Sequence, residues 1–466
     1  MCFPQTTPDS GSKRPGSMTA LDCETVNAEV PSVVEAQVRQ RPSLFADFSW
    51  MLVGNAVYAG GQFATLMLLA KLLRPEMVGQ YALGLAVVYP VMMFANLQLR
   101  AVITSDLREQ THFGYYLGLR LLTTSLGLMI VFISTQLLRY GWELTTVVLM
   151  VGLAYSMETI SDVYYARLQL HDRMAEIAKS MIARASLSVL VLSIATYITR
   201  SLLWGITGIV IARLTILLSY DICRRTHGLR THSGWLSRGK ELTPRFNLTV
   251  QRKLVWLSLP LGIVVLLGCL NASIPNFFIK HALGDRDVGI FAALGFMVSV
   301  GNMAVVSLGQ PAFTRLAASY ADGNFSTFAW LLARLLAFGA AIGTGGMLIS
   351  KLAGREILTF LFRPEYAQRA DLLTWIMAAG GVLFMAQFLG FGMTAANFYH
   401  SQVIVNVLAN VSLFLACYWL VARQGLLGAI LAMLIAATVQ LAGSVLILVR
   451  GMRMHTHLIG KGIERA

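Results

Sequence analysis

Charged residues are scarce in this sequence of 466 residues. Asp, Glu, Lys and Arg together make up 13% of it, whereas a soluble domain usually carries about 25%. Apolar residues make up 56%. A chain of this composition cannot bury its apolar side chains in a globule that faces water, so a soluble fold is excluded and an integral membrane protein is expected.

Several signatures of chemistry are also missing. There is no glycine-rich phosphate loop that ends in Gly-Lys-Ser or Gly-Lys-Thr, so the chain carries no P-loop ATPase of its own. The five cysteines and eight histidines are scattered and show no ligand spacing, and we therefore expect no metal and no cofactor. No large hydrophilic domain is available to hold an active site, so we do not expect an enzyme.

Long apolar windows are what the sequence has in abundance. About twelve of them are long enough to cross a hydrocarbon layer of roughly 30 Å as helices. Continuous apolarity, rather than ten-residue alternation, predicts helices and not a barrel. The windows run 48–71, 81–103, 116–138, 144–166, 180–200 and 203–223, and then 254–279, 288–312, 330–350, 371–396, 403–421 and 425–449.

A phrase near the first turn occurs twice. LRPEMVGQYALGL begins at Leu73 and LGDRDVGIFAALG begins at Leu283, so that Gly79 matches Gly289. Two further matches follow in the same order, at the first helix and at the last helix of each half. We therefore expect an all-α integral membrane protein in which two six-helix pseudo-repeat lobes, residues 48–223 and 254–449, are related by an axis along the membrane normal.

Lysine and arginine are concentrated in the segment 224–253, between the two lobes. Cytoplasmic loops carry an excess of these residues, so we expect this basic inter-lobe loop to be cytoplasmic. An even number of spans then places both termini in the cytoplasm, as a polar, disordered tail over 1–47 and a second tail over 450–466.

The segment 351–370 is also basic but falls on the outer side, and we interpret it as an interfacial amphipathic segment. The net charge of +14 is thus assigned to membrane orientation and not to nucleic acid.

Glycine and proline interrupt the first helix of each lobe. Gly54 lies in the first window, and Pro260 and Pro275 lie in its partner. Interrupted helices in corresponding positions are a sequence pointer to a transport path, so these residues are candidate bends for gating during alternating access. The alternative is that glycine and proline are simply commoner in membrane helices than in soluble ones.

Ionisable groups within the windows form the first set of candidate site residues. Arg213 lies near the middle of the sixth window, where a charge is costly and needs a partner or a wet cavity. Glu158 and Asp162 are four residues apart in the fourth window and share one helix face. Two alternatives stay open for Arg213, an ion pair with one of these acids and a contact to an anionic substrate. The two acids are candidates for coupling to a proton or another cation.

Groups near helix ends and neutral amides form the second set. Arg100 matches Gln310 in the repeat, which favours a vestibule shared by the two lobes. Lys280 can extend to the interface from a helix end. Asn271 and Asn276 add hydrogen-bonding groups within a span, where ties between helices are the alternative role.

A family resemblance is carried by residues 259–302, LPLGIVVLLGCLNASIPNFFIKHALGDRDVGIFAALGFMVSVGN, and by LGQPAFTRLAASYADGNF, which follows at 308–325. The first half agrees in style, with LLRPEMVGQYALGLAVVYPV at 72–91. These residues resemble the Wzx-type polysaccharide repeat-unit flippases, which handle O-antigen and exopolysaccharide units, of the multidrug, oligosaccharidyl-lipid and polysaccharide exporter superfamily.

The resemblance implies a multi-pass protein of the bacterial inner membrane. Its substrate would be an undecaprenyl-pyrophosphate-linked oligosaccharide, which the protein would flip from the cytoplasmic to the periplasmic leaflet. This transport would be coupled to an ion gradient. Arg100, Arg213 and Lys280 would then be cationic residues of the substrate cavity. Membrane lipid, a polysaccharide polymerase and a chain-length regulator are the other partners that the resemblance suggests.

Two other functions compete with this interpretation. A cation-coupled multidrug exporter of the same superfamily would need acids in its cavity, which Glu158 and Asp162 supply, whereas Arg213 counts against it. A membrane polymerase or ligase acting on the same glycans would need a large periplasmic loop with catalytic groups, and the predicted topology leaves no room for one.

Overall fold

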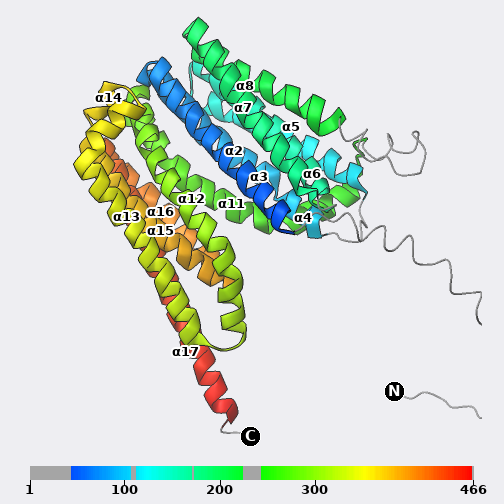
Figure 1. Ribbon diagram of the computed structural model, residues 1–466, viewed down its shortest axis with the longest axis vertical. Helices are drawn as coiled ribbons and strands as arrows, with labels where there is room; N and C mark the ends of the chain where they lie inside the picture. The colour runs from blue at the N-terminus through cyan, green and yellow to red at the C-terminus, as the bar shows by residue number, and fades with distance from the viewer. Residues whose placement is uncertain (1–43, 106–111, 171–172, 224–242, 464–466) are drawn as a thin grey trace, which may run out of the picture.

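The computed structural model describes residues 44–105, 112–170, 173–223 and 243–463. This part of the chain folds into helices and contains no strand (Figure 1). The helices of the first half are α2 (Leu44–Leu72), α3 (Pro75–Asn96), α4 (Leu99–Ser105), α5 (Phe113–Leu137), α6 (Trp142–Leu170), α7 (Met174–Thr199), α8 (Leu202–Ile216) and the π-helix η1 (Leu217–Cys223). Those of the second half are α11 (Leu248–Leu283), α12 (Asp285–Ala321), α13 (Phe325–Leu361), α14 (Pro364–Ala367), α15 (Ala370–Ala395), α16 (Tyr399–Gln424) and α17 (Leu426–Ile463).

Twelve segments of the described chain are helical, long and apolar enough to cross a membrane. Each overlaps one of the windows predicted from the sequence, so the prediction of an all-α, multi-pass membrane protein is confirmed. The agreement has a physical basis, because every backbone N–H and C=O inside hydrocarbon must be satisfied within its own segment and a helix does this. The second span, Pro75–Thr104, includes α3 and all but the last residue of α4.

Several helices continue beyond the predicted windows. α13 runs to Leu361, so Lys351 and Arg355 lie on its last turns and the chain bends only afterwards, before the short α14. α17 continues to Ile463, through most of the segment predicted as a tail. Hydropathy marks where a helix leaves the apolar layer and not where its hydrogen bonds stop, which explains these extensions. The polar tail predicted over 1–47 lies almost wholly outside the described residues, as does the larger part of the basic loop.

Most helix contacts fall within one half of the sequence or the other. In the first half α2 packs on α7, and α6 packs on α3, α5 and α8, whereas in the second half α13 packs on α15 and α16 packs on α17. Figure 1 shows α2–α8 on one side and α13–α17 on the other, with α11 and α12 between them. The main connection between the halves is α3, which packs on both α11 and α12, and α2, α4 and α5 make smaller contacts with the same two helices.

The two copies of the repeated phrase lie against each other at the end of the molecule where α2 turns into α3 and α11 turns into α12. We call this the far end, and the opposite end, where α2 begins and α17 stops, the termini end (Figure 1). A Cβ atom added to Gly79 would lie 1.7 Å from the backbone oxygen of Asp285, and one added to Gly289 would lie 2.2 Å from that of Pro75. Pro75 and Asp285 are themselves matching positions of the repeat. The contact is therefore reciprocal, and only glycine allows the two backbones to approach so closely.

Polar contacts at the far end also join the halves. Arg363, just before α14, donates from Nε to the backbone oxygen of Lys71 at 3.0 Å and from Nη2 to that of Leu72 at 3.4 Å. These carbonyls belong to the last turn of α2, where no further helix turn can satisfy them. Burial, with the Asp285 carboxylate as a second cause, raises the pKa of Tyr140 to about 12. A first-half tyrosine thus lies close to the start of α12.

The termini end holds a third connection. The backbone N–H of Arg245 donates to the oxygen of Gly114, at the start of α5, at 2.9 Å. Leu254, near the start of α11, is buried in a cluster with first-half residues that include Leu97 and Val163. The chain that enters the second half is therefore held against the first half before it crosses the molecule.

Candidate functional site

A cavity of about 290 Å³ lies inside the first half. Residues of α2, α3, α4, α6 and α7 line it, together with Gln98, which lies between α3 and α4. Its charged lining side chains are Arg100, Glu158, Asp162 and Arg184. Ionised groups are costly within a membrane span unless they face water or a partner. The geometry of these four side chains therefore decides what the cavity can bind.

The second span is broken at the wall of this cavity. α3 ends at Asn96, α4 begins at Leu99, and the two residues between them are left-handed, with φ of 51° at Leu97 and 50° at Gln98. Non-glycine residues in this conformation cost of order 1–3 kcal/mol each and persist only where their surroundings hold them. No proline or glycine is present to cause the break, so contacts from other helices must hold it.

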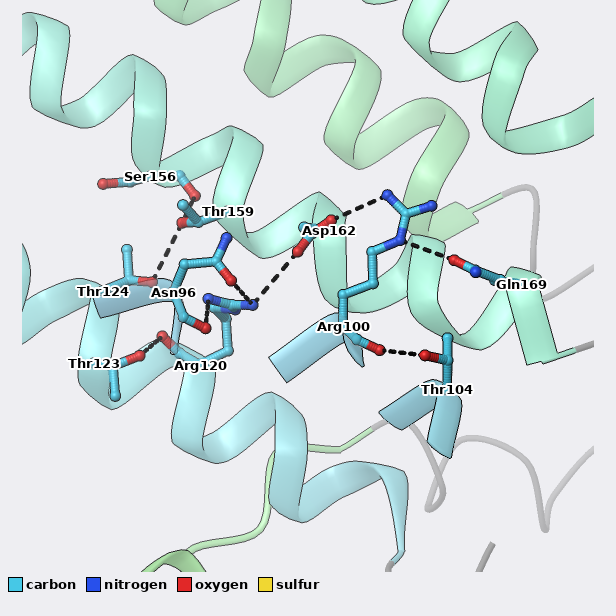
Figure 2. A network of polar contacts seen from close by, with 10 residues as sticks. All are labelled: Asn96, Arg100, Thr104, Arg120, Thr123, Thr124, Ser156, Thr159, Asp162 and Gln169. Atoms are coloured by element: carbon cyan, nitrogen blue, oxygen red, sulfur yellow. Dashed lines mark hydrogen bonds and ion pairs between the residues drawn. The ribbon is translucent and has the colours of Figure 1, made fainter. Parts of the chain in front are cut away.

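Asp162 on α6 lies between two arginines (Figure 2). Its Oδ1 is 3.4 Å from Arg100 Nη1, and its Oδ2 is 3.7 Å from Arg120 Nη2. Arg100 also donates from Nε to Gln169 Oε1 at 3.0 Å. Arg120 extends from α5, is fully buried, and donates to the backbone oxygen of Asn96 at 2.9 Å and to its Oδ1 at 3.0 Å. Both arginines thus share one carboxylate at distances longer than the roughly 2.7–2.9 Å of a strong charged hydrogen bond.

Glu158, one helical turn from Asp162, is held more tightly. Arg213 on α8 donates from Nη1 to Glu158 Oε2 at 2.8 Å and to the backbone oxygen of Ala154 at 3.0 Å. The hydroxyl of Tyr58 donates to the other carboxylate oxygen, and Gln62 donates to that hydroxyl at 2.9 Å. The guanidinium of Arg213 also lies over the ring of Tyr155, 5.4 Å from its centre. Glu158 is therefore charge-compensated within the first half.

A further ion pair, which is buried, joins α7 to the π-helix. Arg184 donates to Asp221 Oδ2 at 2.9 Å and to the hydroxyl of Tyr165 at 2.8 Å. Ser180 donates to the other oxygen of Asp221 at 2.7 Å. Asp221 is completely buried, so its charge is stabilised by these donors alone. The pair fixes η1 against α6 and α7.

The structure distributes the predicted site residues over several places. Arg100, Glu158 and Asp162 line the cavity, whereas Arg213 lies behind Glu158 and does not line it. Lys280 lies at the far end and pairs with Asp285. Asn271 and Asn276 lie on α11, where Asn276 donates to the backbone oxygen of Ala272 at 3.1 Å.

The candidate bends lie in unbroken helices. α2 passes through Gly54 without interruption, and a Cβ added there would lie 2.9 Å from the backbone of Ala178, so this glycine allows α2 to approach α7. α11 is likewise continuous through Pro260 and Pro275. The side chains of Pro260 and Gln310 lie outside the part that the structure describes. The helix break found at Leu97 and Gln98 was not predicted.

Three ionisable residues of these networks were missed by sequence reasoning, namely Arg120, Arg184 and Asp221. Arg120 and Arg184 each follow the predicted start of a window by only four residues, so they resemble side chains that extend to the interface. Asp221 lies near the end of its window. A search for charges of opposite sign on neighbouring spans could have found these residues. It could not have told which acid pairs with which arginine.

The second half has a different interior. From Leu372 to Ala422 and from Gln424 to Val449 the sequence contains no Asp, Glu, Lys or Arg. Amides make the polar contacts there: Asn410 donates to the backbone oxygen of Leu267 at 3.0 Å, and Gln440 donates to Asn406 Oδ1 at 3.2 Å. Among the described residues of either half, no group of three or more His, Cys, Asp or Glu could hold a metal ion.

Comparison with known proteins assigns the chain to a family. The model of the family described as "Polysaccharide biosynthesis protein" matches residues 44–317. The chain belongs to the polysaccharide biosynthesis protein family. The match covers the whole first half, with its cavity, and continues through α11 and most of α12.

Known relatives of this protein are similar to it in length and fold. It is 26% identical over 399 residues to the capsular polysaccharide biosynthesis protein CapF of Staphylococcus aureus, and the alignment covers 85% of this chain and 96% of CapF. The solved structure of the lipid II flippase MurJ in an inward closed conformation is similar, with a TM-score of 0.68, 10% identity, and coverage of 86% of this chain and 88% of MurJ. An inward-facing multidrug resistance transporter of the MATE family gives a TM-score of 0.59 at 12% identity, with coverage of 89% and 95%. The two structures establish a shared fold.

Proposed function

We propose that this protein is a transporter that flips an undecaprenyl-pyrophosphate-linked oligosaccharide repeat unit from the cytoplasmic to the periplasmic leaflet of a bacterial inner membrane. The observation that carries the proposal is a cavity with charged walls inside the membrane-spanning bundle of a polysaccharide biosynthesis family member. The relatives named for capsular polysaccharide biosynthesis and for lipid II flipping support the choice of substrate class.

The chemistry of such a substrate explains why it needs a protein. A glycan and a pyrophosphate cannot enter hydrocarbon without losing hydrogen bonds to water, which costs several kcal/mol per group. A cavity with arginine and amide walls replaces these bonds, while the polyprenyl chain stays in lipid. Arginine suits pyrophosphate because its planar guanidinium donates two parallel hydrogen bonds. Arg100, which is partly exposed to the cavity, is the residue in the best position for this contact.

Alternating access of two lobes, residues 48–223 and 254–449, would move the substrate. In this proposal both termini are cytoplasmic and the far end faces the periplasm. The reciprocal glycine contact and the Arg363 bonds then close the periplasmic side in the state described here. A polymerase and a chain-length regulator would use the glycan after its release.

Coupling to an ion gradient is assigned in this proposal to the acids of α6. Asp162 is the better candidate of the two because its arginine contacts are long, whereas Glu158 is held by Arg213 and Tyr58. We expect Asp162→Asn to make transport insensitive to the membrane gradient and Glu158→Gln to reduce transport through loss of structure. Transport measured with and without an ionophore, at matched protein levels, tests this assignment. A gradient response retained in Asp162→Asn and lost in Glu158→Gln would reverse it.

The deciding experiment is the leaflet distribution of the lipid-linked glycan in cells with and without the gene, followed with a membrane-impermeant glycan probe. Glycan trapped on the cytoplasmic side in the deletion, and released on complementation, is the expected result. Glycan that still reaches the outer side but stays unpolymerised would replace the proposal with a role after flipping, such as a membrane polymerase or ligase.

A cation-coupled multidrug exporter is the second candidate function. Two observations favour it, the fold shared with the MATE transporter and the carboxylates on the cavity wall. Resistance to cationic drugs would then fall in the deletion strain while polysaccharide export stayed normal. The arginines that neutralise both carboxylates make this outcome the less expected one.

A further inference from the structure

The break between α3 and α4 leaves a backbone carbonyl that needs a donor. In an unbroken helix the oxygen of Asn96 would accept from the backbone N–H of Arg100, four residues later. The left-handed residues Leu97 and Gln98 end that pattern. Arg120 supplies the replacement from another helix, since its Nη1 donates to this oxygen at 2.9 Å and its Nη2 to the side-chain oxygen of the same residue at 3.0 Å (Figure 2).

Arg120 is suited to hold the break and not to touch a ligand directly. Its side chain is fully buried and does not line the cavity. Two donors in one plane fix both oxygens of Asn96, a geometry that the single ammonium of lysine cannot reproduce. Gln98, within the break, and Arg100, just after it, do line the cavity. By holding Asn96 through these two donors, the Arg120 guanidinium sets the direction in which the Gln98 and Arg100 side chains point.

Asp162 occupies the position that an external anion would take. Its two oxygens lie 3.4 Å from Arg100 and 3.7 Å from Arg120, both beyond the range of a strong charged hydrogen bond. Arg100 is 30% exposed and Asp162 is 23% exposed, so an anion that enters the cavity can reach both. A phosphate oxygen could bond to Arg100 at a shorter distance and displace the carboxylate.

We propose that the α3–α4 break forms an anion subsite for a phosphate or pyrophosphate group, in which Arg100 and Gln98 contact the anion, Arg120 is a positioning residue that holds the break, and Asp162 is an internal competitor. The choice of a pyrophosphate group rests on the proposed function, whereas the subsite itself does not depend on it. Binding exchanges one carboxylate for another anion at the same guanidinium, and the displaced Asp162 carboxylate stays on the cavity wall, where it is partly exposed.

The test is binding of inorganic pyrophosphate to the purified full-length protein, measured by calorimetry at low salt. We expect Arg100→Gln to weaken binding by about tenfold or more, the effect of losing a hydrogen bond to a charged group. Arg120→Lys, which keeps the positive charge but not the two planar donors, is expected to weaken pyrophosphate binding by a similar factor. Asp162→Asn is expected to strengthen binding several-fold because the competitor is removed. Arg334→Gln, an exposed arginine on α13, is the matched control for loss of charge and is expected to bind like the wild type.

A rescue experiment separates positioning from simple charge. Asparagine adopts the left-handed conformation more readily than glutamine and keeps an amide at this partly buried position, so Gln98→Asn favours the break independently of Arg120. We expect Arg120→Lys with Gln98→Asn to recover part of the lost affinity. No recovery, or wild-type affinity in Arg120→Lys alone, would overturn the positioning role. If Arg120→Lys does not fold, Arg100→Gln and Asp162→Asn still decide the subsite, because unchanged affinity in both would eliminate it.

The source of the anion is decided by a second ligand, undecaprenyl pyrophosphate in nanodiscs. Tighter binding of this lipid than of inorganic pyrophosphate, with the same response to Arg100→Gln, assigns the subsite to a lipid headgroup. Equal affinities assign it to a free anion. If the leaflet experiment fails while these binding effects hold, the proposed function falls and the subsite stands.

Discussion

The two halves share a repeated backbone but differ in what their interiors hold. The described spans of the first half contain acidic and basic residues that are joined in ion pairs, whereas α15 to α17 have long stretches with no Asp, Glu, Lys or Arg. Seven residues make up the first-half set: Arg100, Arg120, Glu158, Asp162, Arg184, Arg213 and Asp221. The repeat therefore preserves helix packing and the far-end contact, while the ion pairs around the cavity lie in the first half.

This difference separates the two halves by the kind of chemical group that each can bind. Charges within a span are costly and are typically found at functional sites. Under the proposed function, the first half would contact the ionic group of the substrate, and the second half would offer amides and apolar surface to the rest of it. Three changes test this comparison.

The largest effect is expected from Arg213→Gln in the first half. Removing one partner of a buried ion pair leaves the other charge uncompensated, which costs about 3–5 kcal/mol in soluble proteins. Arg213 is 9% exposed and has Glu158 as its acidic partner, so we expect a large loss of thermal stability and of export. Export yield and melting in detergent measure the two effects.

The control for this change is the double variant Arg213→Gln with Glu158→Gln. It removes both charges, and most of the stability should return. A double variant as unstable as the single one would show that Arg213 stabilises the bundle by packing on Tyr155 and not by neutralising Glu158.

An intermediate effect is expected at the contact between the halves. Gly79→Ala and Gly289→Ala each insert a methyl group into a backbone contact, and overpacking of this kind costs about 1–3 kcal/mol. Because the contact is reciprocal, both variants should shift the protein by a similar amount away from the state in which the far end is closed. Labelling of a cysteine introduced near the far end measures that shift, with Gly60→Ala, where an added Cβ meets nothing within 4 Å, as the control. Strongly unequal shifts would contradict the symmetry.

The smallest effect is expected in the second half, from Asn410→Leu. It removes an amide that donates to the backbone of α11 at 3.0 Å. Hydrogen bonds between membrane helices contribute about 0.6 kcal/mol on average, so the melting temperature should fall slightly and export should persist. A loss of export comparable to that of Arg213→Gln would remove the proposed difference between the halves.

Sequence patterns predict the fold well because apolar length and helix number are local properties. The twelve spans follow from composition, and the repeated phrase marks a contact that the structure contains. The site is less predictable. Helical spacing places Glu158 and Asp162 on one face, but it does not tell which arginine each acid meets. The pairing with Arg213 was one of two alternatives left open.

The break at Leu97 and Gln98 could not be predicted at all. Neither residue favours a left-handed backbone, and the donor that supports it, Arg120, comes from a different helix. Tertiary contacts override local preference there. The glycine and proline residues that do suggest breaks, Gly54 and Pro275, lie instead in continuous helices.

The reciprocal contact of Gly79 and Gly289 also bears on how the chain arose. Since Gly79 meets the start of α12 and Gly289 meets the start of α3 at matching positions, each half presents the same patch to the other, as the subunits of a two-fold symmetric dimer do. A single six-helix protein carrying one such glycine could have formed this interface with its own copy. Fusion of two genes would then have kept the interface within one chain.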